Sequence, residues 1–150
     1  MHLRAFFDER AVRLDLAGQS KDEVLRELVQ LLGVDDKSEQ ILFKMLKRRE
    51  NLGSTGIGRG IAIPHCRSLV VNRLRVAYGR APRGVEYRAL DGRPVQNFFL
   101  IVAPPVEQSN DYLPVLGKLA LLARDPEVPA RLASMHEPDE LFSLFEEKAV

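Results

Sequence analysis

Apolar and charged residues alternate over residues 11–16 (AVRLDL), and this period of two predicts a β-strand. Gly18 ends the run. Ser20, followed three residues later by Glu23, has the form of a capping box and marks the start of a helix. Apolar side chains then recur at helical spacing until Gly33 ends the element. The inner face of this first helix is expected to consist of Val24, Leu25, Leu28, Leu31 and Leu32.

The pattern changes from helical to extended in the middle of the chain. A second helix is expected over residues 36–49, with an inner face formed by Ile41, Leu42, Met45 and Leu46. Residues 74–78 are typical of a strand, and residues 81–84 (APRG) and 90–93 (LDGR) are typical of turns. Residues 95–103 (VQNFFLIVA) form the most apolar run and predict a central strand buried on both faces.

Helical spacing returns in the last third of the chain. A helix is expected over residues 109–123, then a short one starting at Asp125 and Pro126, and a last one over residues 138–148. Inward positions are expected to be Leu113, Leu116, Leu119, Ala120, Leu122, Leu141, Leu144 and Phe145. Strands therefore dominate the middle, between helices. This order predicts the α/β class, a single-domain sandwich over residues 1–150 with a mixed central β-sheet flanked by helices on both faces.

Length and charge restrict the class of protein. A chain of 150 residues suits one domain. The formal net charge of +1 favours neither nucleic acid nor an anionic membrane as a partner. No stretch approaches the ~18 apolar residues of a membrane span, and residues 1–16 are too charged for a secretory signal. Cys66 is the single cysteine, which excludes a disulfide framework and fits a reducing cytoplasm.

Three alternating glycines lie in the segment 54–67, STGIGRGIAIPHCR. The spacing is neither the Gly-x-Gly-x-x-Gly of dinucleotide-binding folds nor a Walker loop, so no nucleotide site is expected. Two interpretations remain for the glycines alone. They allow a tight connection between packed elements, which is the more frequent case, or a small concavity of backbone N–H groups that binds an anion.

His65 follows this segment directly after Pro64, at the end of a short apolar run. A neutral imidazole nitrogen is a competent nucleophile at cellular pH, and a phosphoryl group on it needs mainly positioning and charge stabilisation. The alternative is a structural histidine whose ring donates to a carbonyl. His2 and His136 are weaker candidates, at a chain end and in a helix junction. No histidine spacing suits a metal, so neither a metal site nor a cofactor is expected.

Two neighbours of this motif have alternative interpretations. Cys66 points away from His65 in extended backbone, which indicates packing rather than a catalytic pair. Arg49 belongs to a basic cluster at the end of the second helix, where the negative end of the helix dipole stabilises cations. Its planar guanidinium could instead turn to the loop and bind phosphate.

The run over residues 49–65, RENLGSTGIGRGIAIPH, resembles the signature of enzyme IIA domains of the bacterial phosphotransferase system, fructose/mannitol class. It is most similar to the stand-alone nitrogen-regulatory branch. The resemblance extends over nearly the whole chain, and its Ser-Thr-Gly-Ile-Gly to Ala-Ile-Pro-His match is long and specific. Such domains are mixed sheets flanked by helices, which agrees with the pattern of elements above.

The resemblance implies a phosphoryl-transfer role. His65 matches the histidine that accepts a phosphoryl group from the phosphocarrier HPr or its nitrogen-branch relative, and Arg49 matches an arginine beside it. Ser54, Thr55 and Gly56 are the expected phosphate-binding loop residues. The stand-alone branch regulates transporters and kinases by phosphorylation-dependent binding. The permease-linked branch passes the phosphoryl group to a sugar through a IIB domain.

One position departs from the family pattern. A second histidine is usual at the start of the helix after the apolar strand, and here Tyr112 occupies that position. A tyrosine hydroxyl can donate to phosphate but carries no positive charge. Three functions follow: a cytoplasmic phosphohistidine regulator, a sugar-specific IIA component, or a contact-only domain that takes no phosphate. Ala5, Phe6 and Phe7 could pack on the body or on a second copy in a homodimer.

Overall fold

The computed structural model describes residues 2–105 and 110–150. In its first half the elements are η1 (Leu3–Phe6), β1 (Phe7–Arg13), α1 (Lys21–Gln30), α2 (Asp36–Asn51), β2 (Gly56–Gly58), β3 (Ile61–Ala62) and β4 (His65–Arg67). The second half contains β5 (Arg75–Val85), β6 (Val95–Ala103), α3 (Tyr112–Arg124), α4 (Val128–Ala133) and α5 (Asp139–Glu147). Helices thus precede and follow the main strands, as the pattern of apolar residues predicts.

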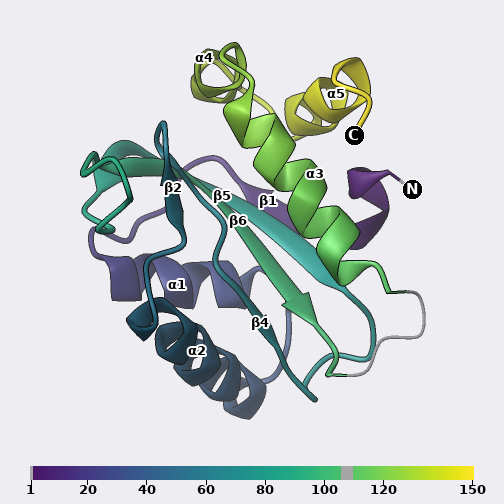
Figure 1. Cartoon of the computed structure of the whole chain (residues 1–150). Coiled ribbons are helices and arrows are strands. Elements are labelled where there is room, and N and C mark those ends of the chain that lie inside the picture. The colour runs from purple at the N-terminus through teal and green to yellow at the C-terminus, as the bar shows by residue number, and fades with distance from the viewer. Residues whose placement is uncertain (1, 106–109) are drawn as a thin grey trace.

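The strands form one mixed sheet in the order β1-β5-β6-β3-β2, with β4 paired to β6 beyond the end of β3 (Figure 1). β1 and β5 are parallel, β5 and β6 are antiparallel, and β3 and β4 both run parallel to β6. The long pair β5–β6 is the centre of the sheet. The short strands β3 and β4 lie along β6, so the chain from the glycine segment to His65 follows the edge of this strand.

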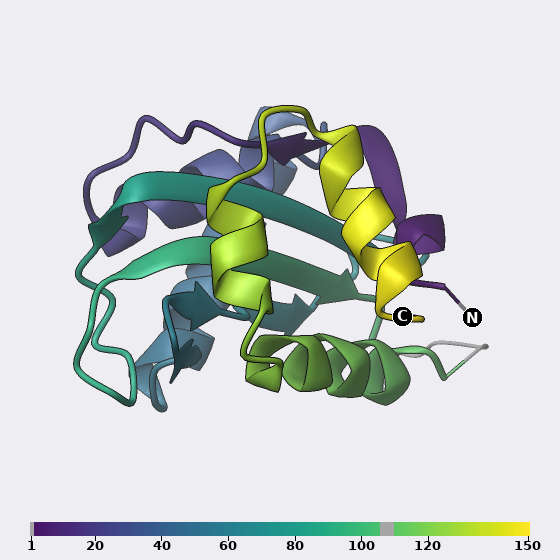
Figure 2. The same cartoon turned by 90° about the horizontal axis from the view of Figure 1, so that it is seen from above.

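Strand β6 is buried on both faces, and this property divides the core in two. Phe98, Leu100 and Val102 belong to the apolar cluster beneath α1 and α2. Phe99 and Ile101 alternate with them and belong to the cluster beneath α3, α4 and α5. The two groups of helices lie on opposite sides of the sheet (Figure 1), and Figure 2 shows the second group from above. The predicted α/β class with helices on both faces is confirmed.

The first and the long central strands differ from the predicted ranges. β1 lies at Phe7–Arg13, earlier than the expected 11–16, although the Leu16 N–H still bonds to the Arg80 carbonyl at 2.8 Å. The predicted turn at 81–84 is wrong, because β5 continues through it with a register shift between Arg80 and Val85. The composition of APRG is typical of a turn but equally suits a β-bulge. The turn at 90–93 is confirmed, with Gly92 at φ +71°.

Most of the helical predictions are confirmed. Ser20 caps α1 by accepting from the Glu23 N–H at 3.2 Å. α4 begins at Val128, a little after the expected Asp125, and α5 follows its prediction closely. The predicted first residue of the long helix, 109, lies outside the described residues, and within them α3 starts at Tyr112.

Two aliphatic residues that are predicted to point inward are exposed. Ile41 is 40% exposed and Leu113 is 71% exposed. In α2 the buried stripe is narrower than expected and contains Leu42 and Leu46. In α3 the buried residues are Val115, Leu119, Leu122 and Ala123, so the stripe is rotated away from Leu113. Helical spacing alone does not determine whether apolar residues at the two margins of a helix face are buried.

The N-terminal aromatic residue Phe7 packs on the body of the protein. Its ring lies 5.5 Å from Phe142 and 5.6 Å from Phe145 between centroids. Of the two arrangements open for Ala5, Phe6 and Phe7, the structure therefore contains intramolecular packing by Phe7. Within the described ranges no helix has the length and apolar character required to span a bilayer.

Candidate functional site

His65 is the first residue of β4, which pairs with β6 so that His65 lies opposite Ile101 and Arg67 lies opposite Ala103. Side chains alternate along a strand, so His65 and Arg67 share one face and Cys66 occupies the other. Cys66 is buried in the α1–α2 core, while His65 is partly buried and Arg67 is exposed. The short strand after Pro64 therefore leaves the imidazole partly accessible to solvent.

The imidazole has a defined tautomer. His65 Nδ1 lies 2.8 Å from the carbonyl oxygen of Ile63, two residues earlier. A carbonyl oxygen only accepts, so Nδ1 carries the hydrogen in the neutral ring. Nε2 is then the nitrogen with the available lone pair. The structural role considered for a lone histidine, donation to a carbonyl, is present here, and it also prepares the opposite nitrogen as a nucleophile.

A shallow pocket of about 360 Å³ surrounds this histidine at the meeting point of α2, β4 and α3. Its lining consists of Met45, Arg48, Arg49, Leu52, His65, Cys66, Arg67 and Tyr112. The ring centroids of His65 and Tyr112 are 6.1 Å apart. Three of the predicted site residues, His65, Arg49 and Tyr112, thus share one pocket. Among the described residues its lining includes three arginines and no carboxylate, so the site suits an anion.

Arg49 lies in the last turn of α2, which extends to Asn51 rather than ending at Arg49. Its Nη1 donates to the Gly53 carbonyl at 2.9 Å, which ties the guanidinium to the start of the glycine segment. A guanidinium has five N–H donors in a planar fork, so this bond leaves capacity for a further anion. The side chain is partly buried, and its bond to a carbonyl just beyond the helix also fits the alternative role of a cation at the end of α2, so phosphate binding by Arg49 stays a prediction.

Ser54, Thr55 and Gly56 lie beside the strand that leads to His65 but do not line its pocket. Ser54 Oγ donates to the Tyr87 carbonyl at 3.0 Å and accepts from the Gly56 N–H at 3.1 Å. The Thr55 N–H donates to Glu50 Oε1 at 3.0 Å. The polar groups expected to hold phosphate thus bond within the fold, and the assignment of these residues to phosphate binding stays a prediction.

A buried ion pair beneath the site was not predicted from the sequence. Glu50, 6% exposed, lies 2.9 Å from Lys21 Nζ and accepts from Tyr87 Oη at 3.0 Å and from Thr55 Oγ1. Burial, and next the negative charge of Glu50, raises the pKa of Tyr87. One local signal existed, because Glu50 continues the four-residue stripe of Leu42 and Leu46.

The glycine segment itself is a hairpin. β2 and β3 are antiparallel, and Gly58, Arg59 and Gly60 join them with positive φ angles of 102°, 59° and 75°. The Arg59 N–H donates to Asp91 at 2.9 Å, and this bond is the main reason why the pKa of Asp91 is lowered. Ile61 pairs with Asn97, four residues from the partner of His65, or about 13 Å along β6. The turn of the hairpin therefore lies away from the imidazole and connects β2 to β3.

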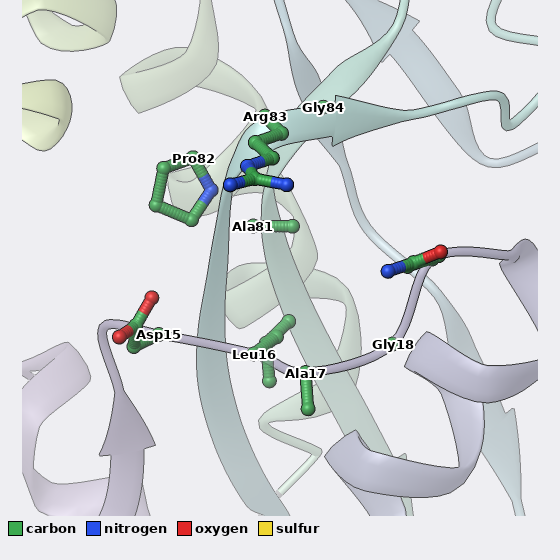
Figure 3. A pocket seen from close by; sticks show the side chains of 9 residues that line it. Asp15, Leu16, Ala17, Gly18, Ala81, Pro82, Arg83 and Gly84 are labelled. Carbon is green, nitrogen blue, oxygen red and sulfur yellow. The ribbon is translucent and has the colours of Figure 1, made fainter.

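A second hollow lies where β5 begins its irregular segment, at the opposite end of the sheet from His65. It has a volume of about 320 Å³, and Figure 3 shows its lining residues from the segment 15–19 and from the segment 81–84. Val85 pairs with Val95 at the start of β6, whereas His65 pairs near its end. Asp15 and Arg83 are its charged residues, and it contains no histidine or cysteine. The pocket around His65 is therefore the candidate site.

Cys66 is expected to resist thiol reagents in the folded protein. Burial raises the pKa of its thiol to about 12, so the thiolate fraction at pH 8 is about 10⁻⁴. Iodoacetamide labelling of the native chain at pH 8 should therefore be much slower than labelling in urea. Comparable rates in the two conditions would contradict the packing role assigned to this residue.

Comparisons with known proteins were consistent across nearly the whole chain. The family described as "Phosphoenolpyruvate-dependent sugar phosphotransferase system, EIIA 2" matches residues 5–148. A nitrogen regulatory protein of Pseudomonas aeruginosa is 32% identical over 133 residues, which cover 87% of this chain and 86% of the relative. The fructose-specific EIIABC component of Bacillus subtilis is 30% identical over 146 residues, 96% of this chain. The chain spans 23% of the length of that larger protein.

Solved structures show the same arrangement of elements. The crystal structure of the nitrogen regulatory protein IIA-Ntr from Neisseria meningitidis superposes with a TM-score of 0.85 at 30% identity, covering 94% of this chain and 97% of that one. The crystal structure of IIA mannitol from Escherichia coli has a TM-score of 0.73 at 23% identity and covers 92% and 97% of the two chains. The second likeness concerns the fold alone.

Proposed function

Since the chain belongs to the phosphoenolpyruvate-dependent sugar phosphotransferase system EIIA 2 family, we propose that it is a phosphohistidine-carrying regulatory protein. It accepts a phosphoryl group on His65 from an HPr-type phosphocarrier and signals by phosphorylation-dependent binding to partner proteins. The observation that carries the proposal is the bond from His65 Nδ1 to the Ile63 carbonyl at 2.8 Å, inside a pocket lined by arginines. This arrangement leaves a nucleophilic nitrogen beside positive charge.

The transfer step follows from that tautomer. The Nε2 lone pair of His65 attacks the phosphorus of the carrier's phosphohistidine, in line with the P–N bond that breaks. The electron pair of the breaking bond returns to the carrier's imidazole nitrogen. The proton on Nδ1 of His65 stays on the ring, where the Ile63 carbonyl stabilises the positive charge that the phosphorylated imidazole acquires. No metal or cofactor enters this step.

Arg49 is the phosphate-binding residue from α2 in this proposal. The bond from its Nη1 to the Gly53 carbonyl fixes one terminal nitrogen of the guanidinium, and the remaining N–H groups are available to the equatorial oxygens of the phosphoryl group. In the transition state the negative charge is spread over these oxygens. Positioned cations therefore contribute more to the rate of transfer than covalent chemistry does. Ser54, Thr55 and Gly56 remain candidate phosphate-binding residues at the margin of this site.

Relatives support the regulatory role over the sugar-specific one. The structure superposes more closely on the nitrogen regulatory protein of Neisseria meningitidis, with a TM-score of 0.85, than on IIA mannitol of Escherichia coli, with a TM-score of 0.73. In the proposed role the protein acts in the cytoplasm, and a transporter or a kinase is the regulated partner. The second candidate is a fructose- or mannitol-type IIA component, which passes the phosphoryl group to a separate IIB domain and is favoured by the match to the EIIABC protein.

The test of the proposal is intact-mass spectrometry after incubation with phosphoenolpyruvate, enzyme I and an HPr-type carrier. We expect one acid-labile phosphoryl group on the chain, and its absence with a control IIA protein labelled in parallel would favour a contact-only domain. Transfer to fructose or mannitol in permease membranes would favour the sugar-specific role. Partner capture that responds to the phosphodonor would support the regulatory role.

A further inference from the structure

The negative charge of a phosphoryl group on His65 is larger than the single positive charge of Arg49. A phosphoryl group carries close to two negative charges near neutral pH, and the residue across the pocket, Tyr112, carries none. Building on the proposed function, we propose that Arg67 is the second cation of the site: held on the Tyr112 ring, it binds the phosphoryl oxygens on His65. Tyr112 then serves as a platform for Arg67 rather than as the phosphate ligand.

The strand geometry places Arg67 on the required side. His65 and Arg67 are two residues apart in β4, so their side chains leave the same face of the strand, while Cys66 between them is buried in the α1–α2 core. Both residues line the same pocket. A side chain at this spacing starts about 7 Å from its neighbour along the strand, and an arginine is long enough to reach over an anion bound at the histidine.

Tyr112 connects the two side chains. The guanidinium carbon of Arg67 lies 4.4 Å from the centroid of the Tyr112 ring, and the His65 ring centroid lies 6.1 Å from the same centroid. The face of an aromatic ring attracts a guanidinium, most strongly where water is excluded. The phenol ring therefore holds the arginine over the pocket and limits the directions in which its charge can move.

A hydrogen bond fixes the other side of the guanidinium. Arg67 Nη1 donates to the carbonyl oxygen of Pro104 at 3.0 Å, directly after the end of β6. Pro104 follows Ala103, the residue that pairs with Arg67 in the sheet, so strand pairing and side-chain contact support one another. With one edge anchored and the face stacked, the fork retains further N–H donors for phosphate oxygens at little additional cost in side-chain entropy.

The neighbouring arginine provides a matched control. Arg48 lines the same pocket from α2 and is exposed. It contributes a charge of the same sign at the same rim, and the aromatic stacking on Tyr112 belongs to Arg67. A comparison of the two positions therefore separates a specific phosphate contact from the general positive potential of the pocket.

The test measures the rate of phosphorylation from the HPr-type carrier, and the lifetime of phospho-His65 after the donor is removed, in Arg67→Gln, Arg67→Lys and Arg48→Gln. We expect Arg67→Gln to lose about 10²-fold in rate, with a shortened lifetime, and Arg67→Lys to lose less. Arg48→Gln should lose only what the general positive potential of the pocket contributes, which is a smaller loss than that of Arg67→Gln. Equal rates in Arg67→Gln and the unsubstituted chain would overturn the proposal, as would equal losses at both arginines. Thermal unfolding checks that each variant is folded.

Two substitutions of Tyr112 decide the role of its ring and remain informative if Arg67→Gln fails to fold. Tyr112→Phe keeps the ring face and removes the hydroxyl, so it should be phosphorylated at nearly the unsubstituted rate. Tyr112→Ala removes the platform and should approach the loss expected for Arg67→Gln. A Tyr112→Phe protein as slow as Tyr112→Ala would assign the phosphate contact to the hydroxyl and overturn the proposal. An unsubstituted chain that takes no phosphoryl group would refute the proposed function itself.

Discussion

A His65→Ala protein is expected to acquire no phosphoryl group under conditions in which the unsubstituted chain acquires one. The substitution removes Nε2, the nitrogen left nucleophilic by the bond from Nδ1 to the Ile63 carbonyl. No other side chain in the described lining of the pocket offers a nucleophilic nitrogen: Cys66 is buried with a thiol whose pKa is raised to about 12, the arginines are cationic, and Tyr112 ends in a phenolic hydroxyl. Intact-mass spectrometry at neutral pH measures the result directly, as complete loss of the labelled species.

His136→Ala is the matched control for this experiment. His136 is exposed in the junction between α4 and α5, and its backbone N–H rather than its ring bonds to Glu140. It should be labelled like the unsubstituted chain. The fold of His65→Ala should persist, because the lost hydrogen bond contributes only about 1 kcal/mol. A phosphoryl group on folded His65→Ala would refute the assignment of the acceptor, whatever its rate.

Features with a local cause were predictable from the sequence. β6 was predicted at its observed bounds, because an apolar run of this length is typical of a strand buried on both faces. The capping bond from the Glu23 N–H to the Ser20 hydroxyl oxygen depends on residues three apart. The outward position of His65 follows from the proline and the strand before it, together with the alternation of side chains. In each case the determining residues lie within one element.

Features that join distant segments were not predictable in this way. The Arg67–Tyr112 contact requires β4 and the start of α3 to meet, and no local pattern encodes that meeting. The turn expected at 81–84 has the composition of a loop, and only pairing with β6 shows that β5 continues through it. The glycines of the hairpin are explained by positive φ angles at Gly58 and Gly60, which the spacing suggests but does not distinguish from an anion site.

Glu50→Ala is expected to cause the largest loss of stability among these substitutions. Glu50 is buried, and its removal leaves Lys21, the Thr55 N–H and the Tyr87 hydroxyl without their shared acceptor. Breaking a buried pair on one side typically costs about 3–5 kcal/mol. The lower end applies here, since the Lys21 side chain is 19% exposed and its ammonium also lies over the Tyr87 ring. Urea unfolding measures the change as a lowered midpoint.

Glu147→Ala controls for the loss of a carboxylate as such. Glu147 pairs with Arg131 at 2.7 Å with both side chains largely exposed, so its removal should leave the urea midpoint unchanged within error. A second variant, Lys21→Met with Glu50→Leu, replaces both charges by apolar groups and should recover part of the lost stability. Equal midpoints for Glu50→Ala and Glu147→Ala would show that the buried pair contributes nothing beyond an ordinary surface contact.

Glu50→Ala should also slow the phosphorylation of His65 in the molecules that remain folded. Glu50 holds Thr55, the Thr55 carbonyl accepts from the Ile63 N–H at 3.0 Å, and the Ile63 carbonyl sets the tautomer of His65. Loosening the first bond loosens the support of the last, so the fraction of rings with Nε2 prepared for attack falls. Because a stability defect alone would disappear well below the unfolding midpoint, the decisive comparison is the phosphorylation rate at low temperature. A rate equal to that of the unsubstituted chain there would confine Glu50 to stability.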